Sequence, residues 1–189
     1  YEAKIAAPSE PTKTGYTFCG WYKEADLINR WNFATDTVTE DITLYAKWTT
    51  DTYDIIYVLD GGANDGANPA SYTIETPTIT LLFATKTGYT FGGWFDASTG
   101  GNKISSIPQG SKGNKTLYAR WTPNTDTAYQ VEHYRQDVSG TGYTKFETDS
   151  LTGTTATTAA AESKTYTGFS ENITHENRVA SGIIAADGS

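Results

Sequence analysis

Alternating apolar and polar positions predict short β-strands along most of this chain. Aromatic residues recur at alternate positions in residues 16–22 and 89–95, and apolar residues alternate with polar ones in 41–49 and 115–122. This period of two is typical of strands, because successive side chains point to opposite faces of a sheet. Residues 53–59 are rich in β-branched and aromatic types and end at an Asp-Gly-Gly turn signal, so a further strand is expected there.

The two aromatic strands belong to a longer duplication. Residues 12–22 return as 85–95, and residues 43–49 return as 116–122, each displaced by 73 positions, although the sequence between these blocks has changed almost completely. Solenoid and propeller repeats have periods of about 20 to 50 residues, in which each repeat is one layer of a shared core. The longer period predicts that each copy is a small domain with a core of its own.

The same comparison predicts where strands are interrupted. Residues 23–33 would permit a turn of helix, but the equivalent residues 96–106 contain a Gly-Gly pair that opposes a stable helix, so a loop is expected in both copies. Gly20, beside Trp21, predicts a bulge in the first aromatic strand. Less regular patterns predict further strands at 1–6, 71–75, 78–84, 129–134, 143–148, 164–169 and 178–185.

These patterns divide the chain into three parts. We expect a first repeat over 1–50, a second repeat over 51–123 and a third segment over 124–189 that lacks both repeated blocks. The first repeat has no counterpart of the strand at 53–59, so it is expected to be incomplete at its N-terminus, and the third segment at its C-terminus. Open sheet edges attract other strands, so we expect either an edge-strand dimer or a loosely ordered first repeat.

The composition favours small aromatic cores and excludes some classes of partner. Five Trp, thirteen Tyr and seven Phe supply large apolar areas for small cores. The net charge of −8 is not interrupted by a basic cluster, so neither nucleic acid nor an anionic membrane surface is an expected partner. Runs of about 18 apolar residues are absent from the sequence, so no membrane insertion of this part is expected.

The sequence offers little material for catalysis or metal binding. Cys19 is the single cysteine, so it excludes an intramolecular disulfide, and with two distant histidines, His133 and His175, it excludes a Cys/His metal site. Gly92 stands at the equivalent position, which favours a tolerated small residue over the alternative of a reactive or thioester-forming thiol. We therefore expect no catalytic residue, no metal and no cofactor.

Other candidates also favour structural roles. The loop 60–66 has oxygen ligands for Ca²⁺ but lacks the terminal Glu of an EF-hand, and a turn is the preferred interpretation. The His-Glu pairs at 132–133 and 175–176 lack the helical spacing of a metalloprotease. No Lys–Asn pair stands out for an isopeptide cross-link, and ligand-binding residues remain unknown. Four tryptophans recur in register, which favours core packing over sugar-stacking platforms: Trp21, Trp48, Trp94 and Trp121.

At these motifs the chain resembles a known family. The run Pro-x-x-Pro-Thr-Lys-x-Gly-Tyr-Thr-Phe-x-Gly-Trp-Tyr at 8–22, followed by Leu-Tyr-Ala-Lys-Trp at 44–48, resembles the Listeria–Bacteroides repeat, the B-repeat type of internalins and other large bacterial surface proteins. In the second copy the likeness extends to the Asp-Gly-Gly at 60–62. The third segment is similar to mucin-binding-protein repeats at 129–134, 151–155 and 164–169.

The resemblance implies a mainly β fold made of tandem small β-grasp, ubiquitin-like beads, arranged as an elongated multi-domain rod. It also implies an extracellular location on a bacterial cell surface or cell wall, with no catalysis. Two functions stay open: a stalk that projects a binding region from the cell wall, with neighbouring repeats as partners, and an adhesin whose beads bind a host or matrix glycan or protein. The loops 23–42 and 96–115 share only Asn29 and Asn102, which favours the stalk.

Overall fold

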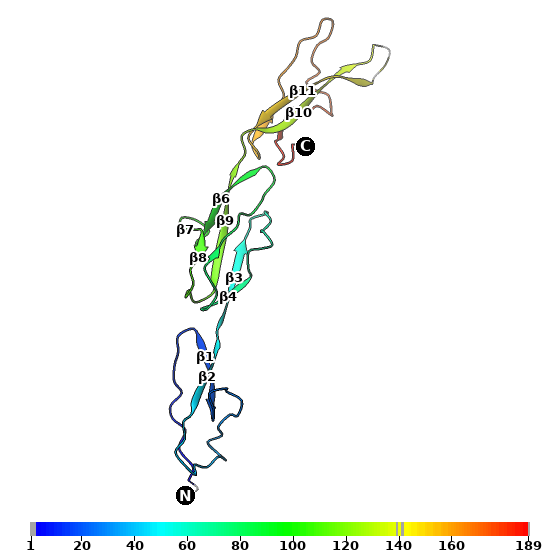
Figure 1. Ribbon diagram of the computed structural model, residues 1–189. Coiled ribbons are helices and arrows are strands. Elements are labelled where there is room, and N and C mark those ends of the chain that lie inside the picture. The colour runs from blue at the N-terminus through cyan, green and yellow to red at the C-terminus, as the bar shows by residue number, and fades with distance from the viewer. Residues whose placement is uncertain (1–2, 139, 141, 189) are drawn as a thin grey trace. The chain divides into compact units, whose positions relative to one another are not determined.

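The structure is a computed structural model that describes residues 3–138, 140 and 142–188, and it is built from strands (Figure 1). The described residues contain no helix, and accordingly none that is long and apolar enough to cross a membrane. The expected mainly β class is therefore confirmed. The strands are β1 Tyr16–Tyr22, β2 Tyr45–Thr50, β3 Thr52–Val58, β4 Ser71–Thr73, β5 Ile79–Thr80, β6 Tyr89–Phe95, β7 Lys103–Ile104, β8 Ser106–Ile107, β9 Lys115–Pro123, β10 Thr127–Gln136, β11 Tyr143–Gly153, β12 Thr158–Ala160 and β13 Ser181–Ile183.

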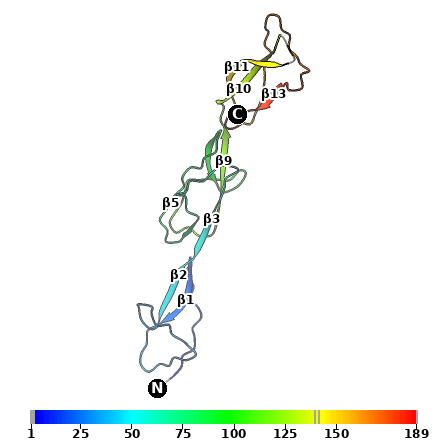
Figure 2. The same ribbon diagram turned by 90° about the vertical axis from the view of Figure 1, so that its right-hand side faces the viewer.

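The strands form small sheets. A five-stranded sheet has the order β4-β3-β9-β6-β7, and two-stranded sheets pair β5 with β8 and β12 with β13. Two further sheets pair β1 with β2 and β10 with β11, and these two pairs can be followed in Figure 2. By contacts, the residues group into two compact units, one comprising 1–56, 67–81 and 104–117 and the other 57–66, 82–103 and 118–189.

The duplication is visible in the strand pairing. β1 pairs antiparallel with β2, and β6 pairs antiparallel with β9, in registers that correspond residue by residue at an offset of 73. Each ladder shifts at the same point, between Phe18 and Gly20 in the first copy and between Phe91 and Gly93 in the second. The predicted bulge beside the tryptophan is thus confirmed in both copies.

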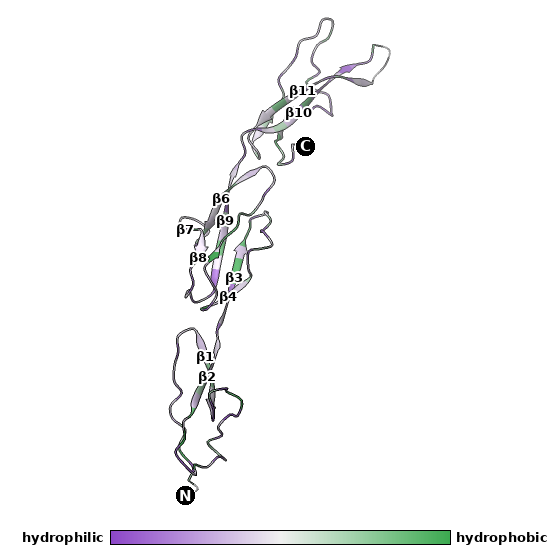
Figure 3. Cartoon of the chain, viewed as in Figure 1, coloured by the Kyte–Doolittle hydropathy of each residue, from purple (hydrophilic) through white to green (hydrophobic). Residues whose placement is uncertain are grey.

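The core is best developed in the second repeat. Trp94 and Leu117 are each 2% exposed there, whereas the equivalent Trp21 and Leu44 are half-buried. The prediction that Trp21 and Trp94 are equivalent core residues is therefore right for Trp94, but Trp21 is buried to a smaller extent than expected. The reason lies in the sheet: β9 has β3 beside it, but β2 belongs to a two-stranded sheet. Figure 3 shows hydrophobic residues gathered on β3.

Trp31 is a core residue that the strand pattern does not identify. It lies in the loop after β1, is 7% exposed, and contacts Phe33 with ring centroids 6.4 Å apart. Its backbone N–H donates to the carbonyl of Trp21 at 2.8 Å, which fastens the loop to β1. Among the described residues its buried indole N–H has no hydrogen-bond partner, a cost of about 1 to 3 kcal/mol.

Several predicted strands differ from those observed. The loop at 23–33 is confirmed, whereas the loop expected at 96–106 is interrupted by β7 and by the first residue of β8. Residues 164–169, expected as a strand, instead contain a turn in which the N–H of Phe169 donates to the carbonyl of Tyr166 at 3.0 Å. Of the expected strand at 178–185, the three residues of β13 are paired. At 1–6 the described part has an isolated bridge between Ala3 and Val38, and residues 1 and 2 lie outside the described residues. The β-grasp arrangement is not confirmed.

Candidate functional site

The repeated motif places three aromatic rings around the bulge of the first repeat. Phe18 lies edge-on between two tryptophans, with ring centroids 5.5 Å from Trp21 and 5.3 Å from Trp48. The bulge brings this about, because it reverses the side to which Trp21 would point and places it on the side of Phe18. The three rings therefore pack as one cluster.

The second repeat repeats this cluster and adds hydrogen bonds. Phe91 lies 5.3 Å from Trp94 and 5.2 Å from Trp121 between ring centroids. The indole N–H of Trp94 donates to the carbonyl of Leu82 at 2.8 Å, and that of Trp121 donates to the carbonyl of Leu59 at 2.9 Å. Each of these tryptophans packs against Phe91 and has its indole N–H satisfied by a backbone carbonyl, which supports the expected packing role over sugar stacking.

A tight turn precedes each aromatic strand. Gly15 has φ 77° and Gly88 has φ 73°, left-handed values that a glycine adopts without steric cost. The N–H of Tyr16 donates back to the carbonyl of Lys13 at 3.0 Å and closes the turn. The ammonium of Lys13 then lies over the Tyr16 ring, 3.6 Å from its centroid. Both conditions explain why Lys-x-Gly-Tyr is retained in the two copies.

An Asp or Asn directly after each repeat locks this turn. The N–H of Asp51 donates to the carbonyl of Gly15 at 2.9 Å, and the hydroxyl of Thr17 donates to the Asp51 carboxylate at 2.7 Å. Asn124, 73 positions later, makes the equivalent bonds, accepting from Thr90 at 2.9 Å and donating to the carbonyl of Gly88 at 2.9 Å. By sequence Asn124 is assigned to the third segment, and the offset of 73 from Asp51 is the signal that could have identified its role in the turn.

Cys19 occupies the bulge of the first repeat. Its Sγ is half-buried and lies 3.4 Å from the hydroxyl of Thr49 and 3.6 Å from the carbonyl of Thr17. At the equivalent Gly92 an added Cβ would lie 3.2 Å from the carbonyl oxygen of Arg120, so this position favours a small residue. The thiol fills space between two strands, in agreement with the expected structural role.

The loop at 60–66 forms a turn held by a lysine. Asp60 has φ 47° and is followed by Gly61 with φ 80°. Lys86 donates to the carbonyl of Asp60 at 2.6 Å, and its ammonium lies 3.6 Å from the Asp60 carboxylate. A cation therefore already faces this carboxylate, which supports the turn over a Ca²⁺ loop.

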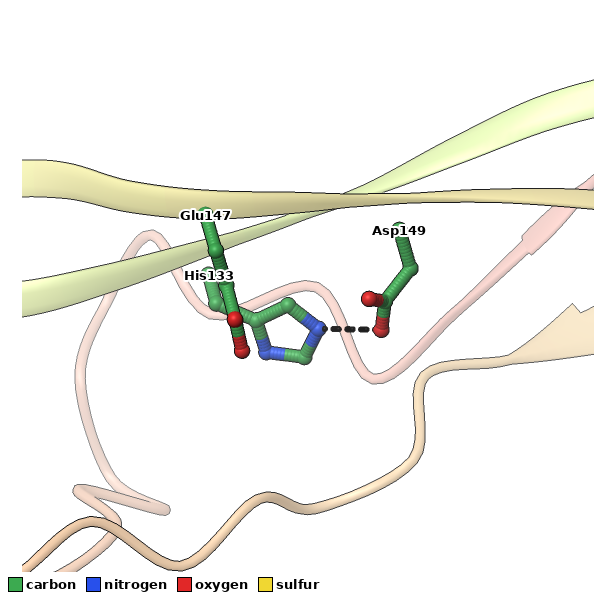
Figure 4. Close-up of side chains that lie close together, drawn as sticks. All are labelled: His133, Glu147 and Asp149. Carbon is green, nitrogen blue, oxygen red and sulfur yellow. Dashed lines mark hydrogen bonds and ion pairs between the residues drawn. The ribbon is translucent and has the colours of Figure 1, made fainter.

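A polar cluster joins the hairpin β10–β11 to the segment after β12, and strand patterns alone do not reveal it. Figure 4 shows its three members on the hairpin, His133, Glu147 and Asp149. His133 on β10 lies opposite Glu147 on β11, and its Nε2 lies 3.0 Å from the carboxylate of Asp149. The ammonium of Lys164 reaches both acids, at 2.5 Å from Asp149 and 3.0 Å from Glu147. The hydroxyl of Tyr166 donates to Glu147.

The contacts within the cluster shift the pKa values of its two acids and its lysine toward the charged forms. The hydrogen bond from Lys164 lowers the pKa of Asp149, with a further contribution from His133. The hydrogen bonds from Tyr166 and Lys164 lower the pKa of Glu147. The two carboxylates in turn raise the pKa of Lys164. At neutral pH the cluster therefore holds two carboxylates against an ammonium.

This arrangement limits the chemistry that the cluster can perform. One ligand atom from each of His133, Glu147 and Asp149 lies within 4.8 Å of the others, which is close enough for a metal ion, but Lys164 already binds both acids and a cation would have to displace it. Amide formation between Lys164 and Asp149 needs a neutral amine and a neutral acid, whereas the shifts favour the charged forms. The geometry fits an ion-pair network, and the expected absence of a metal site stays a prediction.

The two His-Glu pairs are engaged separately. Glu132 binds Lys145 at 2.9 Å and accepts from the hydroxyl of Tyr134 at 2.7 Å. The ring of His175 lies edge-on to Tyr143, with centroids 4.5 Å apart. These contacts agree with the interpretation that neither pair forms a metalloprotease site.

Comparisons with known proteins agree with the motif. The model of the Listeria-Bacteroides repeat domain matches residues 1–47 and 53–120. Internalin H of Listeria monocytogenes is 43% identical over 122 residues, which cover 64% of this chain and 22% of that protein. Two proteins of Evansella cellulosilytica, both named as membrane proteins, are 34% identical over 137 and 129 residues, which cover 71% and 67% of this chain.

The extent of these matches defines what they show. The chain spans 22%, 20% and 14% of the lengths of these three relatives, so each likeness concerns one region of the relative and not the whole protein. No solved structure matches the chain significantly. The repeat model matches more than half of the residues, in two segments that contain the two copies of the aromatic motif. The chain therefore belongs to the Listeria-Bacteroides repeat family.

Proposed function

We propose that this chain is a non-catalytic repeat region of a bacterial cell-surface protein, where it acts as a stalk that projects a binding region from the cell wall. The observation that carries the proposal is the role of the repeated residues. Phe18, Trp21 and Trp48 form an aromatic cluster, and Gly15 and Asp51 hold a turn, in contacts that recur at an offset of 73.

Selection for a stalk and selection for a ligand site leave different residues unchanged. A stalk needs each copy to fold, so its packing and turn residues recur, whereas a repeated glycan site would keep exposed loop residues. Here the loops 23–42 and 96–115 share a single identity, Asn29 with Asn102. That asparagine also has a structural role, since Asn29 and Asn102 bind the carboxylates of Glu24 and Asp96, respectively.

The proposal also covers the domain division of the chain, the fold of its repeats and its location. We propose three parts, at 1–50, 51–123 and 124–189, with β-grasp repeats in an elongated multi-domain rod and a mucin-binding-protein-like third segment. The matching registers of β1–β2 and β6–β9 support the two repeats, and the distinct hairpin β10–β11 supports a third part of another type. The likeness to internalin H and to two proteins named as membrane proteins supports the extracellular location at the cell surface.

Replacing the repeats in the parent surface protein separates a stalk from an adhesin. Residues 51–123 are deleted, and in a second strain they are exchanged for an unrelated folded spacer of the same length. For a stalk, deletion weakens adhesion and the unrelated spacer restores it. If the spacer fails to restore adhesion, the repeats themselves bind the ligand.

A binding screen of the isolated chain provides the complementary test. The 189-residue chain is applied to a glycan array and to immobilised matrix proteins. A stalk binds neither. Saturable binding that Trp121→Ala abolishes without unfolding the protein would favour the adhesin instead.

A further inference from the structure

The turn at the start of each aromatic strand also contacts the part of the chain that follows the repeat. In the first repeat, a Cβ added to Gly15 would lie 2.6 Å from Cδ1 of Ile74, so the two residues are in close contact. The hydroxyl of the next residue, Tyr16, donates to the carboxylate of Glu75 at 2.7 Å. Ile74 and Glu75 directly follow β4, in the second repeat.

The equivalent turn in the second repeat makes an equivalent contact. A Cβ added to Gly88 would lie 2.8 Å from Cα and 2.9 Å from Cβ of Ala186. Ala186 follows the buried Ile184 in the third segment, in a turn that the N–H of Gly188 closes onto the carbonyl of Ala185 at 3.0 Å. Each of the two contacts lies inside one compact unit.

The two contacting segments are unrelated in sequence. Ile74 stands in Ser-Tyr-Thr-Ile-Glu, whereas Ala186 stands in Ile-Ala-Ala-Asp-Gly. Duplication of the repeat therefore explains the turn that receives the contact but not the two segments that make it. Ile74 and Ala186 share two features: each has a small or aliphatic side chain, and each stands at the second position of a hydrogen-bonded turn.

The chain also leaves each repeat at this turn. Asp51 and Asn124 directly follow β2 and β9, the last strands of the first and second repeats. The N–H of each donates to the carbonyl of the glycine in the turn, Gly15 or Gly88, at 2.9 Å. The point of exit and the point of contact with the next part thus coincide. Two attachments at one place restrict rotation, whereas one connector residue alone would leave it free.

We propose that the Gly-Tyr turn and its Asp or Asn lock form a docking joint for whichever domain follows the repeat. The joint accepts a small or aliphatic side chain against the glycine, where any Cβ would push the next domain away. In the first joint, the hydroxyl of Tyr16 adds a bond to the next domain. This inference concerns the coupling between successive domains and holds for a stalk and for an adhesin alike.

Distance measurements between spin labels test the first joint. In a Cys19→Gly background, labels are placed at the exposed positions Glu40 and Lys112, and pulsed electron paramagnetic resonance measures the distribution of distances between them. The joint predicts a narrow distribution that becomes broad in the double variant Tyr16→Phe/Asp51→Ala. The matched control Asp26→Ala removes an exposed acid from the same repeat and leaves the distribution narrow.

Hydrogen exchange adds a local measurement. In Tyr16→Phe alone, the amide of residue 51 should exchange about two- to tenfold faster, the factor that corresponds to one typical hydrogen bond. Unchanged protection of β1 and β2 shows that the repeat stays folded. If the double variant unfolds, Tyr16→Phe alone replaces it in the distance measurement and in hydrogen exchange.

Two results would overturn the joint. One is a distance distribution that is already broad in the unmodified chain, which is the behaviour of a free tether. The other is a distribution and an exchange rate at residue 51 that Tyr16→Phe does not change. In contrast, Asn124→Ala must leave the first distribution narrow, because that residue locks the second joint.

Discussion

Replacement of Trp94 by alanine should unfold the second repeat more readily than the equivalent replacement of Trp21 unfolds the first. Trp94 is 2% exposed, its ring lies 5.0 Å from Tyr57 and 5.3 Å from Phe91 between centroids, and its N–H donates to the carbonyl of Leu82. Removing a buried aromatic side chain costs about 3 to 5 kcal/mol through lost transfer free energy and the cavity left behind. A small domain has about 5 to 15 kcal/mol in total.

The half-buried Trp21 provides the matched comparison within the same molecule. Because less of its surface leaves water on folding, we expect about half of the cost of Trp94→Ala. Thermal and urea unfolding, followed by hydrogen exchange to assign each transition to a repeat, would measure both. For a domain of this size each kcal/mol corresponds to about 4 to 8 °C in the melting temperature.

Two outcomes would refute this reasoning. If Trp94→Ala melts within a degree or two of the parent protein, the side chain does not carry the core, and a surface role in ligand binding regains support. If Trp21→Ala costs as much as Trp94→Ala, then the exposed fraction does not govern the contribution of the motif tryptophans.

Three further predictions follow from the described contacts. Cys19→Gly should leave the melting temperature and any adhesion unchanged, and loss of cell attachment in intact-cell assays would contradict this. The third segment should lose stability in acid, as Asp149 and Glu147, whose pKa values are lowered, protonate below their ordinary 3.8 and 4.5, and in alkali, as Lys164, whose pKa is raised, deprotonates above 10.5. Melting temperatures measured against pH should show a plateau between these limits, and salt should weaken the effect because these groups are only partly buried. A synthetic peptide with the sequence of β3 and the following turn should bind the open edge of β2 and slow hydrogen exchange there, whereas equal protection of β2 and β9 without peptide, in a protein that light scattering shows to be monomeric, would contradict an open edge.

The sequence predicts the strands of the motif well because their signals are local. Alternating aromatic residues and a glycine beside Trp21 are sufficient to place β1, β6 and the bulge that each contains. The run at 164–169 carries a similar alternation but forms a turn, in which Gly168 has φ 83° and Tyr166 donates its hydroxyl to Glu147. A run of six residues with a glycine does not distinguish these two outcomes from pattern alone.

Features that depend on distant contacts could not be predicted. Alternation shows that Trp21 and Trp94 are strand residues, but their exposure depends on whether a third strand lies beside the closing strand. The cluster of His133, Asp149 and Lys164 joins residues 15 to 31 positions apart across a bulged hairpin and a loop. Its register, set by the shift after His133, decides which acids face the lysine.

The lock between the closing residue and the turn also has a consequence for gene evolution. Asp51 and Asn124 each fasten to the repeat that precedes them by the same two bonds, although the residues that follow them differ in sequence. In each copy, the bonds between this residue and the turn therefore join residues that lie within one period of 73 residues. Recombination that adds or removes one period of codons leaves every such contact intact, so the number of repeats can change between strains without a compensating mutation in any core.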